Sequence, residues 1–225
     1  MDGNNGITIL VVTADQLVSA GIVTIVNRCE DMRVLAAASN HTDTISKIGE
    51  MRPSVVILDA ELPAVNPAEI SKRIKSIQPE IRILLLVTER LAKSCLVQTL
   101  QAGVGGYVSK TTTEVHLLTA IRAVHSGEGV MCPRLVYEIA KELDYLGTIT
   151  SSEKDLGPPT EREVEIIKLA AQGLTNRKIA KQLFISERTV QSHLAAVFKR
   201  FGVESRTQAV LSALRNGWIT YDSIT

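Results

Sequence analysis

The chain has few cysteines and no long apolar segment, and these two shortages exclude several classes of protein. Only 3 of its 225 residues are cysteines, and Cys29, Cys95 and Cys132 lie far apart, without a CxxC pair or a neighbouring histidine cluster. This spacing disfavours a disulfide framework or a zinc site and predicts buried, reduced thiols. No apolar run approaches the ~20 residues of a membrane-spanning helix, and the polar start MDGNN resembles neither a signal nor a transit peptide. We therefore expect a cytoplasmic protein that has no membrane partner.

The length and the charge distribution predict two domains. A chain of 225 residues is long enough for two domains of ordinary size. Its net charge is only +1, but residues 158–225 hold 10 basic against 6 acidic side chains, a net charge of +4. Residues 1–140 and 141–157 have net charges of −1 and −2, from 13 against 14 and 2 against 4. The basic excess indicates that a polyanion would bind the C-terminal part, although an ordinary solvated surface would also fit it.

Apolar runs alternate with amphipathic segments through the first half of the chain. This pattern predicts an α/β fold, in which a five-stranded parallel sheet is doubly wound and covered by helices on both faces. Ligands of such sheets bind at the carboxyl ends of the strands. The expected strands are Ile7–Val12, Val34–Ala38, Val55–Leu58, Ile81–Val87 and Tyr107–Val108, and the expected helices are Gln16–Arg28, Thr42–Met51, Pro67–Ile77, Leu91–Ala102 and Thr113–His125.

Polar residues stand at the expected carboxyl ends of four of these strands. An aspartate, a threonine and a lysine that converge on one crevice suit a phosphoryl group, because the carboxylate can accept it, the hydroxyl can donate to its oxygens and the ammonium can pair with its charge. For any one of these residues alone a solvated strand end is the favoured interpretation, and their occurrence at corresponding strand ends shifts the balance. The residues concerned are Thr13 and Asp15 after the first strand, Asp59 after the third, Thr88 and Glu89 after the fourth, and Ser109 and Lys110 after the fifth.

The C-terminal segment is predicted to form four short helices. Thr160 with Glu163, and Ser205 with Gln208, match the capping box that begins a helix. Thr175 is expected to cap the second helix, which should bury Ile179, Leu183 and Phe184. Ala209, Leu211 and Leu214 on the last helix would form either a dimer surface or part of the four-helix core.

The third of these helices, within residues 186–203, is cationic and is predicted to bind nucleic acid. Ser186 is a good N-cap, and Gly202 is expected to end the helix with a positive φ. Val190, Leu194, Val197 and Phe201 recur at steps of four, three and four, so they predict a buried stripe. The opposite face can then enter a groove of duplex DNA, as the second helix of a helix-turn-helix does. That face carries Arg188, Gln191, Ser192, Ala195 and Lys199.

Several motifs give the chain a resemblance to a known family. PSVVILDAELP, with Asp59, and GGYVSK, with Tyr107 and Lys110, lie in the first half, and TEREVEII, GLTNRKIAKQLFISERTVQSHL and RNGWI lie in the second. The chain resembles a response regulator of the NarL/FixJ type, which has a receiver domain, here residues 6–125, and a LuxR-type helix-turn-helix, here residues 158–219. The resemblance implies that Asp59 is the phospho-acceptor, that Thr88, Tyr107 and Lys110 are switch or pocket residues, and that a sensor histidine kinase is a possible partner.

Three positions depart from the pattern of that family. The acidic pair that helps receivers to hold Mg²⁺ is replaced here by Thr13 and Ala14, although Asp15 follows and either reaches the site or caps the first helix. Glu89 stands where the family usually has a small residue, and Thr111 replaces the proline that is common after the lysine. We therefore expect no cofactor and no metal site, with Mg²⁺ bound only if the receiver is phosphorylated after all. In that case Asp15 and Asp59 are the candidate ligands.

The resemblance also divides the chain and assigns roles in DNA binding. We expect a receiver domain at residues 1–130, a linker helix and flexible linker at 131–157, and a DNA-binding domain at 158–225. Gln191, Ser192 and Ala195 occupy positions from which relatives read base edges. The expected phosphate contacts are Thr175, Asn176, Lys178, Arg188, Thr189, Lys199 and Arg200.

The sequence thus predicts a transcription regulator that binds double-stranded DNA as a homodimer, is not an enzyme, and has an atypical receiver controlled without conventional Mg²⁺-dependent phosphorylation. The first alternative is an ordinary two-component response regulator that is phosphorylated on Asp59. The second alternative, from a different class, is a protein-interaction or ligand-sensing module that does not bind DNA.

Overall fold

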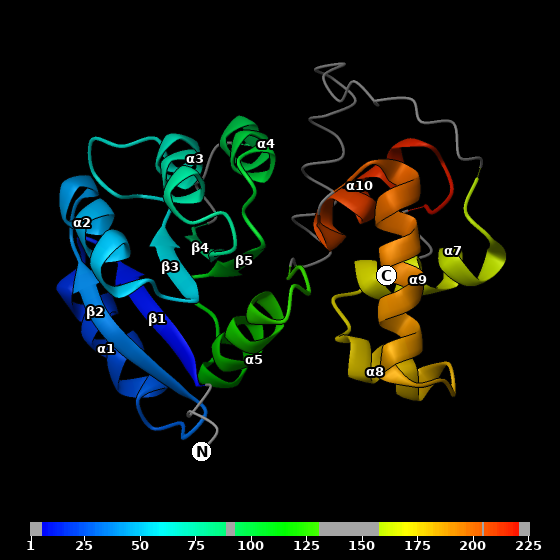
Figure 1. The fold of residues 1–225 in the computed structure, drawn as a ribbon, viewed down its shortest axis with the longest axis horizontal. Coiled ribbons are helices and arrows are strands. Elements are labelled where there is room, and N and C mark those ends of the chain that lie inside the picture. The colour runs from blue at the N-terminus through cyan, green and yellow to red at the C-terminus, as the bar shows by residue number, and fades with distance from the viewer. Residues whose placement is uncertain (1–5, 89–92, 131–157, 204, 221–225) are drawn as a thin grey trace. The chain divides into compact units, whose positions relative to one another are not determined.

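The chain divides into two compact units. The computed structural model describes residues 6–88, 93–130, 158–203 and 205–220. The first unit, Met1–Gly127, is called the sheet unit, and the second, Glu128–Thr225, is called the helical unit. Figure 1 shows the sheet unit in blue to green and most of the helical unit in yellow to red. The predicted linker, residues 131–157, lies outside the described residues together with Glu89 and Cys132.

The sheet unit is built on five parallel strands in the order β2-β1-β3-β4-β5, which confirms the predicted fold class. β3 is buried along its whole length, because strands pair with it on both edges and helices cover both faces. This is the reason why its sequence is a continuous apolar run rather than an alternating one. The strands are β1 (Ile7–Val12), β2 (Met32–Ala38), β3 (Val55–Asp59), β4 (Arg82–Val87) and β5 (Gly106–Ser109).

Five described helices cover this sheet. Figure 1 shows α2, α3 and α4 along one face, with α1 and α5 on the other. Asn66 caps α3, and Pro67 fits the first turn because its missing N–H leaves no intrahelical bond unmade. The helices are α1 (Gln16–Val26), α2 (His41–Met51), α3 (Pro67–Ile77), α4 (Lys93–Gln101) and α5 (Glu114–His125).

The described part of the helical unit contains four helices, as predicted. The Thr160–Glu163 capping box is present, and Ser186 caps α9. Gly202 ends α9 at φ 63°, as its position in the sequence indicates. Phe201 stacks on Trp218, with 4.7 Å between the ring centroids. The helices are α7 (Glu161–Ala171), α8 (Asn176–Gln182), α9 (Glu187–Phe201) and α10 (Arg206–Arg215).

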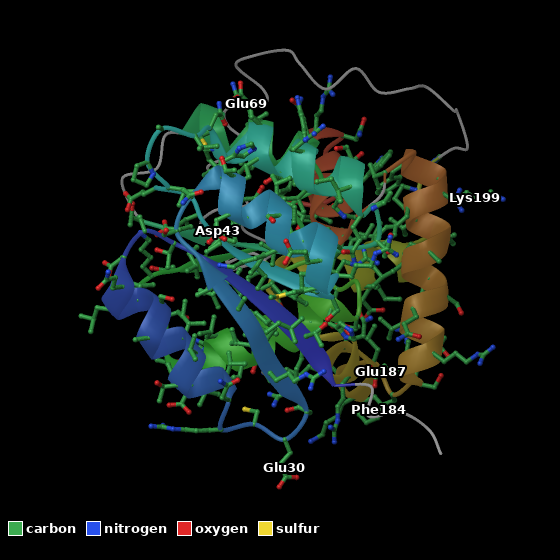
Figure 2. All side chains as sticks on the ribbon, turned by 60° about the vertical axis from the view of Figure 1, so that its left-hand side comes forward. Glu30, Asp43, Glu69, Phe184, Glu187 and Lys199 are labelled. Atoms are coloured by element: carbon green, nitrogen blue, oxygen red, sulfur yellow. The ribbon has the colours of Figure 1, made fainter. Side chains whose placement is uncertain are left out.

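The expectation that Phe184 is buried is wrong. Its side chain is 95% exposed, and Figure 2 labels it just beyond the N-terminal end of α9. The reason is the turn after α8: Phe184 has a φ of 55°, and Ile185 N donates to the Ala180 carbonyl oxygen, as in a Schellman motif. This turn points Phe184 outward.

Other expectations about burial have mixed outcomes. Ala209 and Leu211 are each only 1% exposed, which favours the core of the helical unit for these two, whereas Leu214 is half-buried. Cys29 and Cys95 are free thiols, but both are half-buried and not fully buried. Burial nevertheless raises the pKa of Cys95. Among the described residues, no helix has the length and apolar content needed to cross a membrane.

Glu163 connects the beginning of α7 to α9. Its Oε2 accepts from Thr160 N at 2.7 Å, and its Oε1 lies 3.6 Å from Arg200 Nη2. Burial alone would raise the pKa of Glu163, but the hydrogen bonds from Thr160 and the charges of Arg200 and His193 outweigh it and lower the pKa below the ordinary 4.5. The ionised carboxylate therefore stabilises the folded helical unit at neutral pH.

We predict that Glu163→Ala destabilises the helical unit by about 1 to 2 kcal/mol, the range for losing a helix cap with a charged hydrogen bond. Unfolding is followed by the fluorescence of Trp218, the only tryptophan in the chain. Because the folded pKa is depressed, the difference between wild type and variant should be fully present above about pH 4.5 and should shrink as the pH falls through the folded pKa. Glu161→Ala, an exposed carboxylate in the same helical turn, is the control. Equal midpoints for the two variants would contradict this role.

Candidate functional site

Four polar residues gather where β1, β3, β4 and β5 end. Because neighbouring strands of the sheet are parallel, their carboxyl ends meet at one edge. Thr13 follows β1, Asp59 ends β3, Thr88 follows β4 and Lys110 follows β5. The topology therefore brings together the residues that the sequence pattern singled out. We call this group the strand-end pocket and add Glu61 to it for the contacts described below.

Asp59 is a buried carboxylate, and each of its two oxygens accepts a hydrogen bond from the protein. One of them also pairs with a lysine ammonium. Its side chain is only 4% exposed. Oδ2 accepts from Thr13 Oγ1 at 2.6 Å, while Oδ1 lies 2.8 Å from Lys110 Nζ and accepts from Glu61 N at 2.9 Å. A buried carboxylate is tolerable only when donors surround it in this way. Thr13 thus fills part of the coordination of Asp59 with a hydroxyl, at a position where the acidic pair of receivers would place a carboxylate.

Glu61 belongs to the pocket although the sequence analysis did not select it. Its Oε1 accepts from Thr88 Oγ1 at 2.8 Å, and its Oε2 accepts from Lys110 Nζ at 3.0 Å. The threonine hydroxyl and the lysine ammonium that were expected to hold a phosphoryl group therefore both contact a carboxylate of the protein. The feature of the sequence that could have identified Glu61 is its acidic side chain two residues after Asp59, in the segment DAELP.

Lys110 lies between two carboxylates. Burial would lower the pKa of Lys110, but the hydrogen bonds and the charges of Asp59 and Glu61 outweigh this and raise it. The lysine is therefore firmly protonated. One positive charge faces two negative charges, so these three side chains together carry one excess negative charge.

Two other predicted pocket residues, Asp15 and Tyr107, make their contacts elsewhere, while Glu89 lies outside the described residues. Asp15 Oδ1 accepts from Leu17 N and Val18 N, so Asp15 caps α1, the alternative role considered for it. Tyr107 is 2% exposed, and its hydroxyl hydrogen-bonds with Thr99 and with the Leu96 carbonyl oxygen of α4. Burial raises the pKa of Tyr107 far above its ordinary value of 10.0. Tyr107 therefore connects β5 to α4 and does not line the strand-end pocket.

The pocket does not fit the Mg²⁺ ion that a receiver-like fold implies. Mg²⁺ requires oxygen ligands in octahedral geometry and is usually anchored by carboxylates. Within the described ranges, no group of three or more His, Cys, Asp or Glu side chains is arranged to hold a metal ion. Thr13 supplies a hydroxyl that already donates to Asp59, and the carboxylate of Asp15 caps α1. The ligands that remain near Asp59 already bind the ammonium of Lys110.

A second candidate site is the exposed face of α9. Because an α-helix turns roughly 100° per residue, the five positions expected to enter a groove share an arc of roughly 100°. The stripe of Val190, Leu194 and Val197 is buried on the opposite side. Lys199 projects outward from α9 in Figure 2, near the end away from Glu187. The exposed residues of this face are Arg188, Gln191, Ser192, Ala195 and Lys199, and we call it the reader face.

The remaining residues expected to contact DNA divide into two groups. Lys178 is exposed, Thr189 is half-buried, and Thr175 caps α8 by accepting from Lys178 N. Asn176 is 4% exposed, and its Oδ1 accepts from the buried guanidinium of Arg206. Arg200 pairs with Glu163 and donates to the Pro158 carbonyl oxygen.

Of Asn176 and Arg200, only Asn176 is too buried for the expected DNA contact, because the Arg200 side chain is 26% exposed. Both side chains are engaged inside the helical unit because they satisfy buried or half-buried polar groups there. Burial lowers the pKa of Arg206 to about 10, an effect that the charge of Glu128 opposes. We assign Asn176 to the stability of the unit, and the other expected contacts, Arg200 among them, remain predictions.

Comparison with known proteins gives a match in each unit. Residues 9–122 match the family described as response regulator receiver domain, and residues 159–213 match bacterial regulatory proteins of the luxR family. The transcriptional regulatory protein LnrK of Bacillus subtilis (strain 168) is 31% identical over 214 residues, which cover 92% of this chain and 97% of LnrK.

Two solved structures are also similar. The response regulator ChrA of a heme-sensing two-component system has a TM-score of 0.51 at 27% identity, and the match covers 96% of this chain and 100% of ChrA. A structure of two RcsB dimers bound to two parallel DNAs has a TM-score of 0.54 at 20% identity, with 96% and 100% of the two chains covered. At this identity the similarity to RcsB shows the fold alone.

Proposed function

Since the chain belongs to the DNA-binding transcriptional response regulators of the LuxR/NarL family, which are not enzymes, we propose that it regulates transcription with an atypical receiver domain that works without conventional Mg²⁺-dependent phosphorylation of Asp59. The observation that carries this proposal is the occupied strand-end pocket: Thr13, Lys110 and Glu61 already satisfy both oxygens of Asp59.

The physical reason is that phosphoryl transfer depends on positioning and on neutralising the charge of the transferred group. Here two of the three carboxylates that usually hold the metal in a receiver are missing, since Thr13 and Ala14 replace the acidic pair. The cation that remains, Lys110, is shared between two carboxylates. An incoming phosphoryl donor would meet two carboxylates and an ammonium that is already paired with both of them.

The reader face supports the DNA-binding part of the proposal. Gln191 can pair bidentately with adenine, and Ala195 can contact a thymine methyl. The hydroxyl of Ser192 can contact either base. Arg188, Lys199 and Lys178 supply phosphate contacts, with Thr175 and Thr189 beside them. We further propose that the chain acts in the cytoplasm as a homodimer on double-stranded DNA, with residues 1–130 as receiver, 131–157 as linker and 158–225 as DNA-binding domain.

The runner-up is a conventional response regulator that a sensor histidine kinase phosphorylates on Asp59. Asp59, Thr88 and Lys110 occupy the family positions that favour it. A receiver of that kind would need a ligand set for Mg²⁺, and the described residues of this pocket do not offer one.

We predict that incubating the full chain with acetyl phosphate and Mg²⁺ produces no adduct on Asp59, because the described pocket residues offer no ligand set for Mg²⁺ and their donors already contact Asp59 or Glu61. Intact-mass measurement checks this, with Asp59→Asn as the matched control. An acid-stable, base-labile mass increase of one phosphoryl group in the wild type that disappears in Asp59→Asn would support the runner-up.

We predict that Lys199→Ala and Gln191→Ala weaken DNA binding in different ways. Lys199→Ala should reduce the slope of log affinity against log salt by about 1 on any duplex, because it removes one phosphate contact. Gln191→Ala should leave the slope unchanged and cost about 1 to 3 kcal/mol on the preferred sequence only.

Lys72→Ala removes the same charge from an exposed site on α3 and is the control for the salt titration. A wild-type affinity for random duplex that does not depend on salt would exclude DNA binding through the reader face and would favour a role in protein interaction. Equal slopes for Lys199→Ala and Lys72→Ala would remove Lys199 from the interface.

A further inference from the structure

Glu61 makes the contacts that a phosphoryl group on Asp59 would be expected to make. Thr88 and Lys110 are the hydroxyl and the ammonium suited to hold phosphoryl oxygens at this edge of the sheet. Each of them contacts a different oxygen of Glu61, at 2.8 and 3.0 Å. A carboxylate with two oxygens can satisfy one hydroxyl and one ammonium at the same time, as two oxygens of a phosphoryl group would.

The backbone holds Glu61 beside Asp59. Glu61 N donates to Asp59 Oδ1, and Leu62 N donates to the Asp59 carbonyl oxygen at 3.3 Å. Ala60 N extends the ladder to the Leu86 carbonyl oxygen on β4. The side chain of Glu61 therefore starts from a fixed turn next to the acceptor, which lowers the entropic cost of placing its carboxylate between Thr88 and Lys110.

We propose that Glu61 is a built-in substitute for a phosphoryl group, whose carboxylate holds Thr88 and Lys110 in one arrangement without modification of Asp59. This inference rests on the proposed function, since it explains how a receiver domain would adopt a defined state without phosphorylation.

The contact reaches the helix that follows β4. Thr88 is the last described residue before α4, and its hydroxyl is held by Glu61. On the other side of the pocket, Lys110 N donates to the Val87 carbonyl oxygen, and the Tyr107 hydroxyl contacts α4 at Leu96 and Thr99. Glu61 therefore fixes the end of β4 next to β5, which itself holds α4. Losing its carboxylate should loosen the end of β4 first.

The pocket is open to solvent on the side of Glu61. The side chain of Glu61 is 44% exposed, while those of Lys110 and Asp59 are 19% and 4% exposed. Shortening Glu61 therefore leaves a space that a small anion can enter from water. Such an anion would meet the hydroxyl of Thr88 and the ammonium of Lys110, the two donors that Glu61 leaves behind.

The test is chemical rescue of Glu61→Ala by inorganic phosphate in the full chain. The backbone amide signals of Thr88 and Lys110 are followed by NMR, and their hydrogen exchange is measured with and without phosphate at matched ionic strength. We expect amide exchange of Lys110, whose N–H donates to the Val87 carbonyl oxygen, to be about tenfold faster in Glu61→Ala than in the wild type, a change that corresponds to ~1.4 kcal/mol. Phosphate should slow it again and shift both signals saturably, while the wild type stays unresponsive.

Glu30→Ala removes an exposed carboxylate elsewhere in the sheet unit and should behave as the wild type in both measurements. Glu61→Gln keeps the size of the side chain without its charge. It should lower the pKa of Lys110 towards its ordinary value, which a purely steric role of Glu61 would not do. Exchange in Glu61→Ala that equals that of Glu30→Ala, or a phosphate response that is the same in wild type and Glu61→Ala, would overturn the inference.

The acetyl phosphate experiment distinguishes a failure of the proposed function from a failure of the proposed role of Glu61. An Asp59 adduct in the wild type refutes the proposed function whatever phosphate does to Glu61→Ala. If there is no adduct and no rescue by phosphate, the role of Glu61 is refuted while the proposed function stands.

Discussion

The charge of Asp59 at the buried end of β3 is the constraint on which the pocket depends. The charge of a side chain that is only 4% exposed must be paired, since an unpaired buried charge costs several kcal/mol. In this chain the partners are the hydroxyl of Thr13, the ammonium of Lys110 and the backbone N–H of Glu61. These partners fix the ends of β1 and β5 and the turn after β3 around one group. The pocket is thus satisfied by its own residues.

A satisfied pocket has consequences for control. Here Glu61 supplies an acceptor permanently, so the contacts of Thr88 and Lys110 do not depend on a donor of phosphoryl groups. The helical unit shows the same preference for internal pairing. Arg200 binds Glu163, and Arg206 is buried against Leu174 and Asn176, while the reader face of α9 is exposed.

Most of the fold was predictable because periodicity and caps report backbone geometry directly. The bounds of β1 and α3 match the prediction residue by residue, and Thr160, Ser186 and Gly202 cap the helices that they were expected to cap. Phe184 was predicted wrongly because hydrophobicity says nothing about the left-handed turn that points it outward. Glu61 was missed because its role depends on the lengths of three side chains from different strand ends. Asn176 and Arg200 look like DNA contacts in sequence, and only the packing of α10 and α7 reveals their internal partners.

The most direct test of the occupied pocket is to offer it a phosphoryl analogue. Fluorine NMR of the full chain with Mg²⁺ and beryllofluoride, which mimics a phosphoryl group on a carboxylate, distinguishes a vacant pocket from a filled one. The contacts of Asp59, Lys110 and Glu61 predict that only free beryllofluoride is observed. A bound fluorine signal that appears with Mg²⁺ and is lost in Asp59→Asn would show that the pocket accepts a phosphoryl group and would contradict the proposed function.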